Sequence, residues 1–163
     1  MPEHQSQLAP LYKGWDAYQQ HLVTAIAPLT PEQLAAQAAP HLRSIGAIAT
    51  HVIGARARWL HYVLREGGDD LVGIGTWDDP GQPARTAAEL AQALETTWQV
   101  LQAALERWTV ADLDTTLYDT DENGVEERFT RQWVIWHLIE HDLHHGGELS
   151  FSLGMQRLAA IDL

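Results

Sequence analysis

Four long stretches of this chain place apolar residues every three or four positions, and this spacing limits the fold more than any other feature. The stretches run from about Leu8 to Ala27, from Ser44 to Gly67, from Thr86 to about Trp108, and from Arg131 to about Leu153. Residues three or four apart lie on one face of an α-helix, so each stretch predicts an amphipathic helix. Four such helices with mostly local links predict an all-α four-helix bundle, with residues 1–163 as a single domain.

Helix-capping residues indicate where these helices begin and end. Ser44, Thr86 and Thr130 are suitable N-caps, and Gly154 is expected to end the last helix. The sequence TPEQL at residues 30–34 predicts a short additional helical turn with Pro at its first position. The inner face of the second helix is predicted to carry Ile48, His51, Ala55, Trp59 and Tyr62.

Two of the connecting segments have distinct compositions. Residues 69–85 are rich in Gly, Pro and Asp and lack periodicity, so they predict a long ordered loop between the second and third helices, which could shape the mouth of a pocket. Within this loop we interpret Asp78 and Asp79 as a solvated turn. Before the last helix, alternating residues around Asn123 and Gly124 predict a short β-hairpin.

Composition argues against several classes of function. Asp and Glu total 22 against 10 Lys and Arg, a formal net charge of −12, so we expect no nucleic-acid partner. The chain has no cysteine, which excludes disulfides, thiolate metal ligands and a cysteine nucleophile. No apolar run is long enough to span a bilayer and no signal-peptide pattern is present. We therefore expect a cytoplasmic protein with no membrane partner.

The segment WHLIEHDLHHGGELSF, residues 136–151, contains four of the nine histidines. Successive helical residues advance by about 100°, which places these histidines and one glutamate on a stripe roughly a quarter-turn wide. The members of the stripe are His137, His141, His144, His145 and Glu148. A shared face of this kind indicates a polar site within the bundle.

His141 and His145 are four residues apart, a spacing that lets two imidazoles converge on one ion. A facing helix can supply a further ligand, and His51 in the second helix is the candidate. A site of three histidines suits a divalent transition metal and leaves coordination positions open. We expect Zn²⁺ or Ni²⁺ first, with Fe²⁺ and Mn²⁺ as alternatives. Without a metal, the histidines would form a polar core network or a pH sensor.

The remaining members of the stripe have several alternative roles. Glu148 could be a fourth ligand, a general base or an exposed charge. His144 and His137 could pack, orient a ligand or face solvent. Glu148 and His144 are the candidate catalytic residues.

Two segments of the chain resemble the DinB/YfiT-like family of metal-dependent enzymes. They are RSIGAIATHVIGARARWL (residues 43–60) and WHLIEHDLHHGGELSFSLGM (residues 136–155). The resemblance covers nearly the whole chain in helix order, but its specific part is one His in the second helix plus HxxHHxx(E/Q) in the last. It implies a four-helix bundle that binds a divalent metal through His51, His141 and His145. The family often has Arg-Gly before a Gln where this chain has Gly146, Gly147 and Glu148.

The resemblance also implies a class of reaction. Relatives include thiol S-transferases and a thiol-dependent isomerase, which use bacillithiol, mycothiol or glutathione. The expected function is therefore a metal-dependent transferase that activates a low-molecular-weight thiol for attack on a small-molecule substrate. The family also implies a homodimer and a link to stress response. Two alternatives stay open: a hydrolase using metal-activated water, with Glu148 or His144 accepting a proton, and a non-catalytic metal-binding stress-response module.

Overall fold

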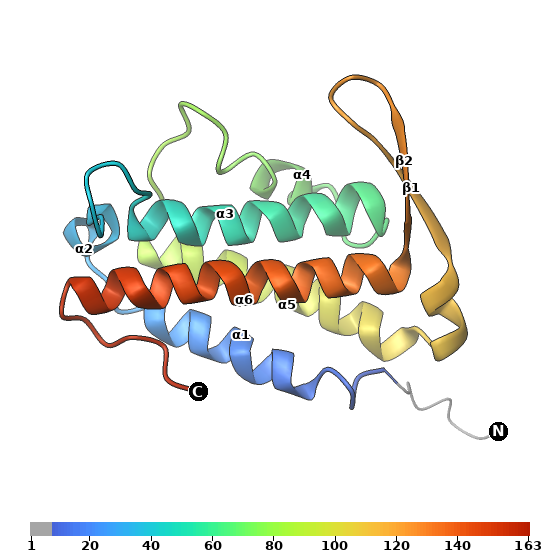
Figure 1. Ribbon diagram of the computed structural model, residues 1–163, viewed down its shortest axis with the longest axis horizontal. Helices are drawn as coiled ribbons and strands as arrows, with labels where there is room; N and C mark the ends of the chain where they lie inside the picture. The colour runs from blue at the N-terminus through green and yellow to red at the C-terminus, as the bar shows by residue number, and fades with distance from the viewer. Residues whose placement is uncertain (1–7) are drawn as a thin grey trace.

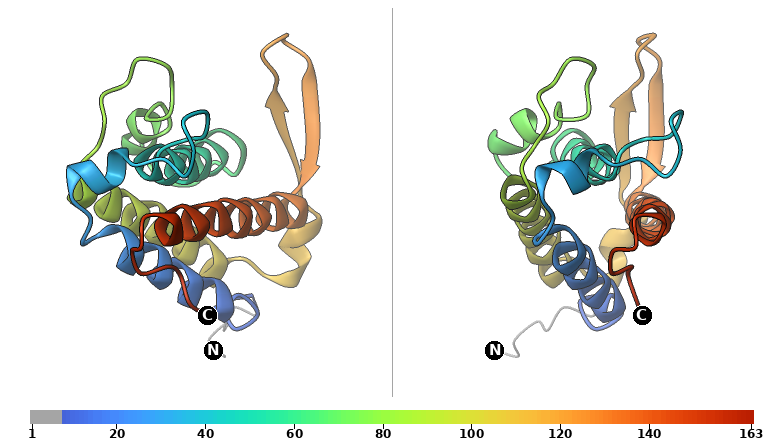
Figure 2. Two further views of the ribbon diagram at one scale, coloured as in Figure 1. Left: turned by 60° about the vertical axis from the view of Figure 1, so that its left-hand side comes forward. Right: turned by 90° about the vertical axis from the view of Figure 1, so that its left-hand side faces the viewer.

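The computed structural model describes residues 8–163, and four long α-helices dominate it (Figure 1). These are α1 (Lys13–Ile26), α3 (Ile45–Arg58), α5 (Ala87–Arg107) and α6 (Arg131–Met155). Helix α3 packs against both α5 and α6, and α1 packs against α5 (Figure 2). The predicted helical class is confirmed. The described residues also form two short α-helices and a two-stranded sheet, which a plain four-helix bundle lacks. None of the helices in residues 8–163 is long and apolar enough to cross a bilayer.

The N-terminal helix is shorter than predicted. Residues 8–12 form turns and α1 begins at Lys13, although Leu8 is still fully buried. Tyr12, the N-cap, has φ of −103° and ψ of 16°, so the backbone leaves the helical conformation there and α1 starts at the next residue. The short helix α2 (Pro31–Ala35) forms as predicted, with Thr30 and Gln33 making a reciprocal capping box.

The second long helix ends in a π-helical turn, η1 (Trp59–Val63). The prediction that Tyr62 faces the core was wrong, because its side chain is 41% exposed. A π turn holds more residues than an α turn, so it rotates the following side chains out of the α-helical phase. Leu60 and Val63 are buried there instead. Arg65 then leaves the helical region with φ of 59°, and Gly67 follows with φ of 77°.

The segment between α3 and α5 is more structured than the predicted loop. It contains the helix α4 (Asp70–Ile74), whose Leu71 is buried in the core. After α4 the chain runs through turns to Thr86. There the Thr86 side chain accepts a hydrogen bond from the Glu89 N–H, and the Glu89 carboxylate accepts one from the Thr86 N–H. This capping box starts α5 where it was predicted.

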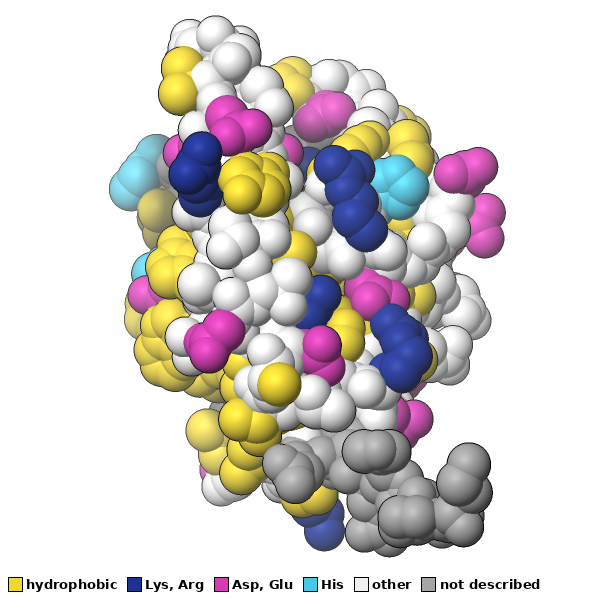
Figure 3. All heavy atoms as spheres, turned by 90° about the vertical axis from the view of Figure 1, so that its right-hand side faces the viewer, with side chains coloured by type: hydrophobic (Ala, Val, Ile, Leu, Met, Phe, Trp, Pro, Cys, Tyr) yellow, Lys and Arg dark blue, Asp and Glu magenta, His cyan; other side chains and the backbone are white. Residues whose placement is uncertain are grey.

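The predicted hairpin is confirmed as two antiparallel strands, β1 (Thr116–Thr120) and β2 (Glu126–Thr130), which follow the 3₁₀ turn η2 (Val110–Asp114). Gly124 adopts φ of 78° in its turn. The hairpin projects beyond the helices at one end of the molecule. Figure 3 views that end, where basic side chains are separated by acidic, hydrophobic and uncharged ones.

Helix α6 begins as predicted, with the Thr130 hydroxyl accepting a hydrogen bond from the Trp133 N–H. It does not end at Gly154. It runs to Met155, and Arg157 takes the left-handed conformation (φ of 58°) that terminates the segment. The helix stops where a residue can turn the chain back, so a glycine inside the last turn is not sufficient to end it.

A fully buried ion pair ties three of the long helices together. Arg56 on α3 donates to both carboxylate oxygens of Asp142 on α6, with its shortest contact 2.7 Å. The indole of Trp15 on α1 donates to the same carboxylate at 2.7 Å, and Arg56 also donates to Gln19 at 2.6 Å. Arg56 and Asp142 are both fully buried, and a buried charge is strongly destabilising unless it is paired with an opposite charge. The network therefore fixes α1, α3 and α6 relative to one another.

Candidate metal centre

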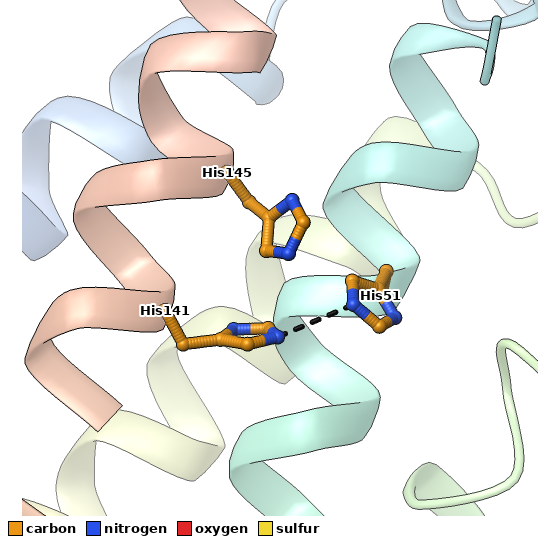
Figure 4. A group of neighbouring side chains, drawn as sticks. All are labelled: His51, His141 and His145. Carbon is orange, nitrogen blue, oxygen red and sulfur yellow. Dashed lines mark hydrogen bonds between the residues drawn. The ribbon is translucent and has the colours of Figure 1, made fainter. Parts of the chain in front are cut away.

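Three histidines from two helices meet between α3 and α6 (Figure 4). His51 comes from α3, and His141 and His145 come from successive turns of α6. The Nε2 atoms of His51 and His141 are 3.2 Å apart, and one ring nitrogen from each histidine lies within 4.8 Å of the others. The structure therefore brings together the three residues that spacing singled out.

The His51 ring is oriented by a carboxylate. Its Nδ1 lies 2.8 Å from Asp78 Oδ2, and Arg58 donates to Asp78 Oδ1 at 2.5 Å and to Oδ2 at 3.1 Å. Burial alone would raise the pKa of Asp78, but the hydrogen bonds from Arg58 and His51 outweigh it and lower the pKa. An ionised Asp78 accepts a hydrogen bond from the Nδ1–H group, which leaves the Nε2 lone pair directed at His141.

A second carboxylate orients His145 in the same way. Its Nδ1 lies 2.8 Å from Glu148 Oε2, one helical turn further along α6. Burial lowers the pKa of His145 even though the hydrogen bond to Glu148 acts in the opposite direction. Glu148 is therefore a partner of His145, and its contact favours the tautomer with a free Nε2.

The pKa of His141 is shifted more strongly than that of His145. Burial, followed by the neighbouring His145, His51, His137 and Arg56, lowers its pKa from 6.5 to about 3. Its Nδ1 is buried and has no hydrogen-bond partner within residues 8–163. The ring is therefore neutral at physiological pH, which is the form that binds a metal.

The donor set fits a divalent transition metal. Three imidazoles converge, two of them are held by carboxylates on the far nitrogen, and no fourth His, Asp or Glu joins the group in the described part of the chain. Imidazole nitrogens suit zinc, nickel and iron(II) better than the hard cations that prefer oxygen.

The other two histidines of the stripe lie outside this group. His137 stacks on Trp133 at 5.1 Å between ring centroids, and Trp59 meets its ring edge-on at 4.9 Å. His144 is exposed, with its ring centroid 4.8 Å from that of His145. His137 thus belongs to an aromatic row beside the centre, and His144 lies at its solvent side.

Asp78 and Asp79 were predicted to form a solvated turn. The prediction holds for Asp79, which is exposed, but was wrong for Asp78. The Asp78 side chain is only 15% exposed and contacts both His51 and Arg58. The sequence offers little to link His51 and Asp78, which are 27 residues apart. The one available indication was Gly54, because a Cβ there would lie 2.5 Å from Asp78 Oδ1, and a glycine inside a helix often has such a packing reason.

Comparison with known proteins agrees with this architecture. The model of the DinB superfamily matches residues 13–149. The crystal structure of a DinB-like protein from Bacillus cereus ATCC 10987 is similar with a TM-score of 0.69 and 23% identity, covering 93% of each chain. A DinB-family protein from Exiguobacterium sibiricum 255-15 is similar with a TM-score of 0.64 and 15% identity, covering 94% of each chain. No protein of curated function matches. The matched span includes all three histidines and most of the chain, which therefore belongs to the DinB superfamily.

Proposed function

We propose that this protein is a divalent-metal-dependent enzyme whose metal is bound by His51, His141 and His145. The observation that carries the proposal is the convergence of these three imidazoles from α3 and α6. Asp78 and Glu148 orient two of the rings from behind, an arrangement that strengthens metal binding in proteins.

The proposed reaction is a transfer that uses a low-molecular-weight thiol. When bound, a divalent cation lowers the pKa of a coordinated thiol and so supplies a thiolate nucleophile. The chain has no cysteine, so the thiol has to come from a cosubstrate such as bacillithiol, mycothiol or glutathione. The protein's own carboxylates orient two of the histidine rings, and a small-molecule electrophile is the expected partner.

The composition of the site supports a catalytic metal over a structural one. A structural zinc is usually held by four protein ligands, whereas three protein ligands leave a position for substrate. In the described residues Glu148 does not join the group, because its carboxylate is engaged with His145 Nδ1.

A hydrolase is the alternative that one observation favours. The Glu148 side chain is 34% exposed beside His145, and the exposed His144 also lies against His145. Either group could accept a proton from an attacking water. Both remain candidate catalytic residues in this proposal.

The proposal also covers the setting of the enzyme. Zn²⁺ or Ni²⁺ is the proposed metal, within one domain whose frame is a four-helix bundle of α1, α3, α5 and α6. The exposed apolar side chains of α6 suit a homodimer: Trp133, Trp136, Leu143, Phe151 and Met155. A cytoplasmic location and a role in stress response complete the proposal.

Thiol consumption tests it directly. Protein reconstituted with Zn²⁺ or Ni²⁺ is mixed with each thiol and a set of electrophiles such as epoxides and alkyl halides, before and after chelation. We expect adduct formation that chelation abolishes, metal restores and His141→Ala lacks. Metal-dependent ester hydrolysis without thiol would favour the hydrolase, and adduct formation unaffected by chelation would contradict the proposal.

A further inference from the structure

A pocket of about 820 Å³ lies between α2, the start of α3 and residues 77–86. The last of these segments arches over α3 in Figure 1. His51 and Asp78 form part of the pocket wall, so the pocket adjoins the candidate metal centre. A volume of this size is typical of sites for small-molecule ligands.

Arg85 lies in this pocket with most of its donors uncommitted. Its guanidinium stacks over the Trp77 ring at 4.4 Å. Its polar contacts are long: 3.5 Å from Nη2 to Gln82 and 4.0 Å from Nη1 to Glu89. Its Nε is buried and has no hydrogen-bond partner among the described residues. The Nη groups, whose present contacts are long, are therefore the donors left for an oxygen-bearing ligand in the pocket.

The charges around the pocket favour an anion. Arg43 is exposed at the pocket and forms no ion pair within residues 8–163. Ser44 and Thr86, the N-caps of α3 and α5, also line it, so two helix dipoles place their positive ends there. Two acidic side chains oppose this field.

The acidic side chains of the pocket wall are Asp78 and Asp79. Asp78 is already paired with Arg58 and His51. Asp79 in the wall and Glu89, 4.0 Å from Arg85, are the acidic groups left against the two arginines. Apolar groups, among them Leu34, Pro83 and the Trp77 ring, form much of the remaining wall. The pocket thus combines a cationic end with an apolar surface.

We infer that this pocket binds a small organic anion, a carboxylate or a phosphate monoester, whose charged group accepts hydrogen bonds from Arg85 and whose apolar body packs on Trp77. Arg43 adds electrostatic attraction at the rim. His51 belongs to both the pocket wall and the three-histidine group, so the anion would be the substrate of the metal centre. That part of the inference rests on the proposed function. The binding of the anion itself requires no metal.

Benzoate, phenyl phosphate and neutral benzamide are suitable probes, titrated against metal-free and Zn²⁺-loaded protein by calorimetry and by NMR of the Trp77 indole. We expect one or both anions to bind and benzamide to bind at least tenfold more weakly. Arg85→Gln should weaken anion binding about tenfold, and Arg43→Gln about threefold. Arg128→Gln, on the exposed hairpin, is the matched control and should leave it unchanged.

Thermal unfolding of each variant establishes that it is folded, and Arg43→Gln provides a second test should Arg85→Gln fail to fold. Anion binding by metal-free protein that depends on Arg85 supports the inference even if no metal is ever bound, in which case only the proposed function fails. Equal binding of benzamide, equal binding by Arg85→Gln and Arg128→Gln, or no binding of any probe would overturn it, whatever the metal content.

Discussion

His51 and His141 are 90 residues apart in the chain, yet their Nε2 atoms lie 3.2 Å from each other. Two lone pairs at this separation repel unless a proton or a cation lies between them. The carboxylate behind His51 fixes its proton on the far nitrogen, so the shared space between α3 and α6 is suited to a cation. The predictions below follow from this relationship and from the packing that maintains it.

Replacing Asp78 with Asn should weaken metal binding by about 10- to 100-fold, since the carboxylate orients the His51 ring and fixes its tautomer. Competition with a chromophoric chelator measures the affinity. Asp79→Asn, at the exposed neighbour, is the control and should bind metal like the wild type. Equal metal affinities for the two variants would show that Asp78 does not help His51 to bind the metal.

Replacing Asp142 with Ala should destabilise the protein by about 3–5 kcal/mol, because Arg56 would stay buried without its counter-charge. Urea denaturation gives the free energy of unfolding. Glu140→Ala, on the exposed face of the same helix, should change it by no more than about 0.5 kcal/mol. Similar values for both variants would mean that the buried ion pair does not hold the helices together.

Alanine at Gly146 and at Gly147 should act in opposite directions. A Cβ at Gly146 would overlap the ring and hydroxyl of the buried Tyr18, whereas one at Gly147 meets open space. Gly146→Ala should cost about 1–3 kcal/mol through overpacking, and Gly147→Ala should stabilise α6 by up to about 1 kcal/mol. Thermal unfolding distinguishes the two, and a stabilised Gly146→Ala would refute the packing described for Tyr18.

Metal-free protein should lose stability as the pH falls from about 6.5 toward 3. The pKa of His141 is about 3 in the folded chain and near 6.5 when unfolded, so between these values only the unfolded chain takes up the proton. The contribution of neutral His141 is complete above pH 6.5 and is lost on acidification. Unfolding free energies from pH 7.5 to 4.5 should therefore fall more steeply for the wild type than for His141→Gln. Parallel curves would contradict the lowered pKa.

The helices and the three-histidine group could be predicted from sequence because both depend on local periodicity. His141 and His145 share a face of any helix containing them, and His51 lies on the apolar face of its own helix. The Thr86 and Thr130 caps likewise depend only on residues three positions away. Such features require no knowledge of how the chain packs.

Features that depend on tertiary packing could not be predicted in this way. The π turn exposes Tyr62 although its spacing fits the inner face. Asp78 reaches His51 only because the chain after α4 folds back over α3. Arg56 and Asp142 resemble ordinary surface charges until two helices bury them together. Each outcome depends on a contact between segments far apart in the sequence.

Metal content after dialysis tests the central claim most directly. Elemental analysis of untagged wild type, His51→Ala and His141→Ala, with His144→Ala as the control from the same helix, measures the metal per chain. The account predicts about one zinc, nickel or iron per wild-type and His144→Ala chain, and loss of that metal in the other two. A wild type that holds no metal even after reconstitution, or a His51→Ala variant that retains it fully, would contradict the site between α3 and α6.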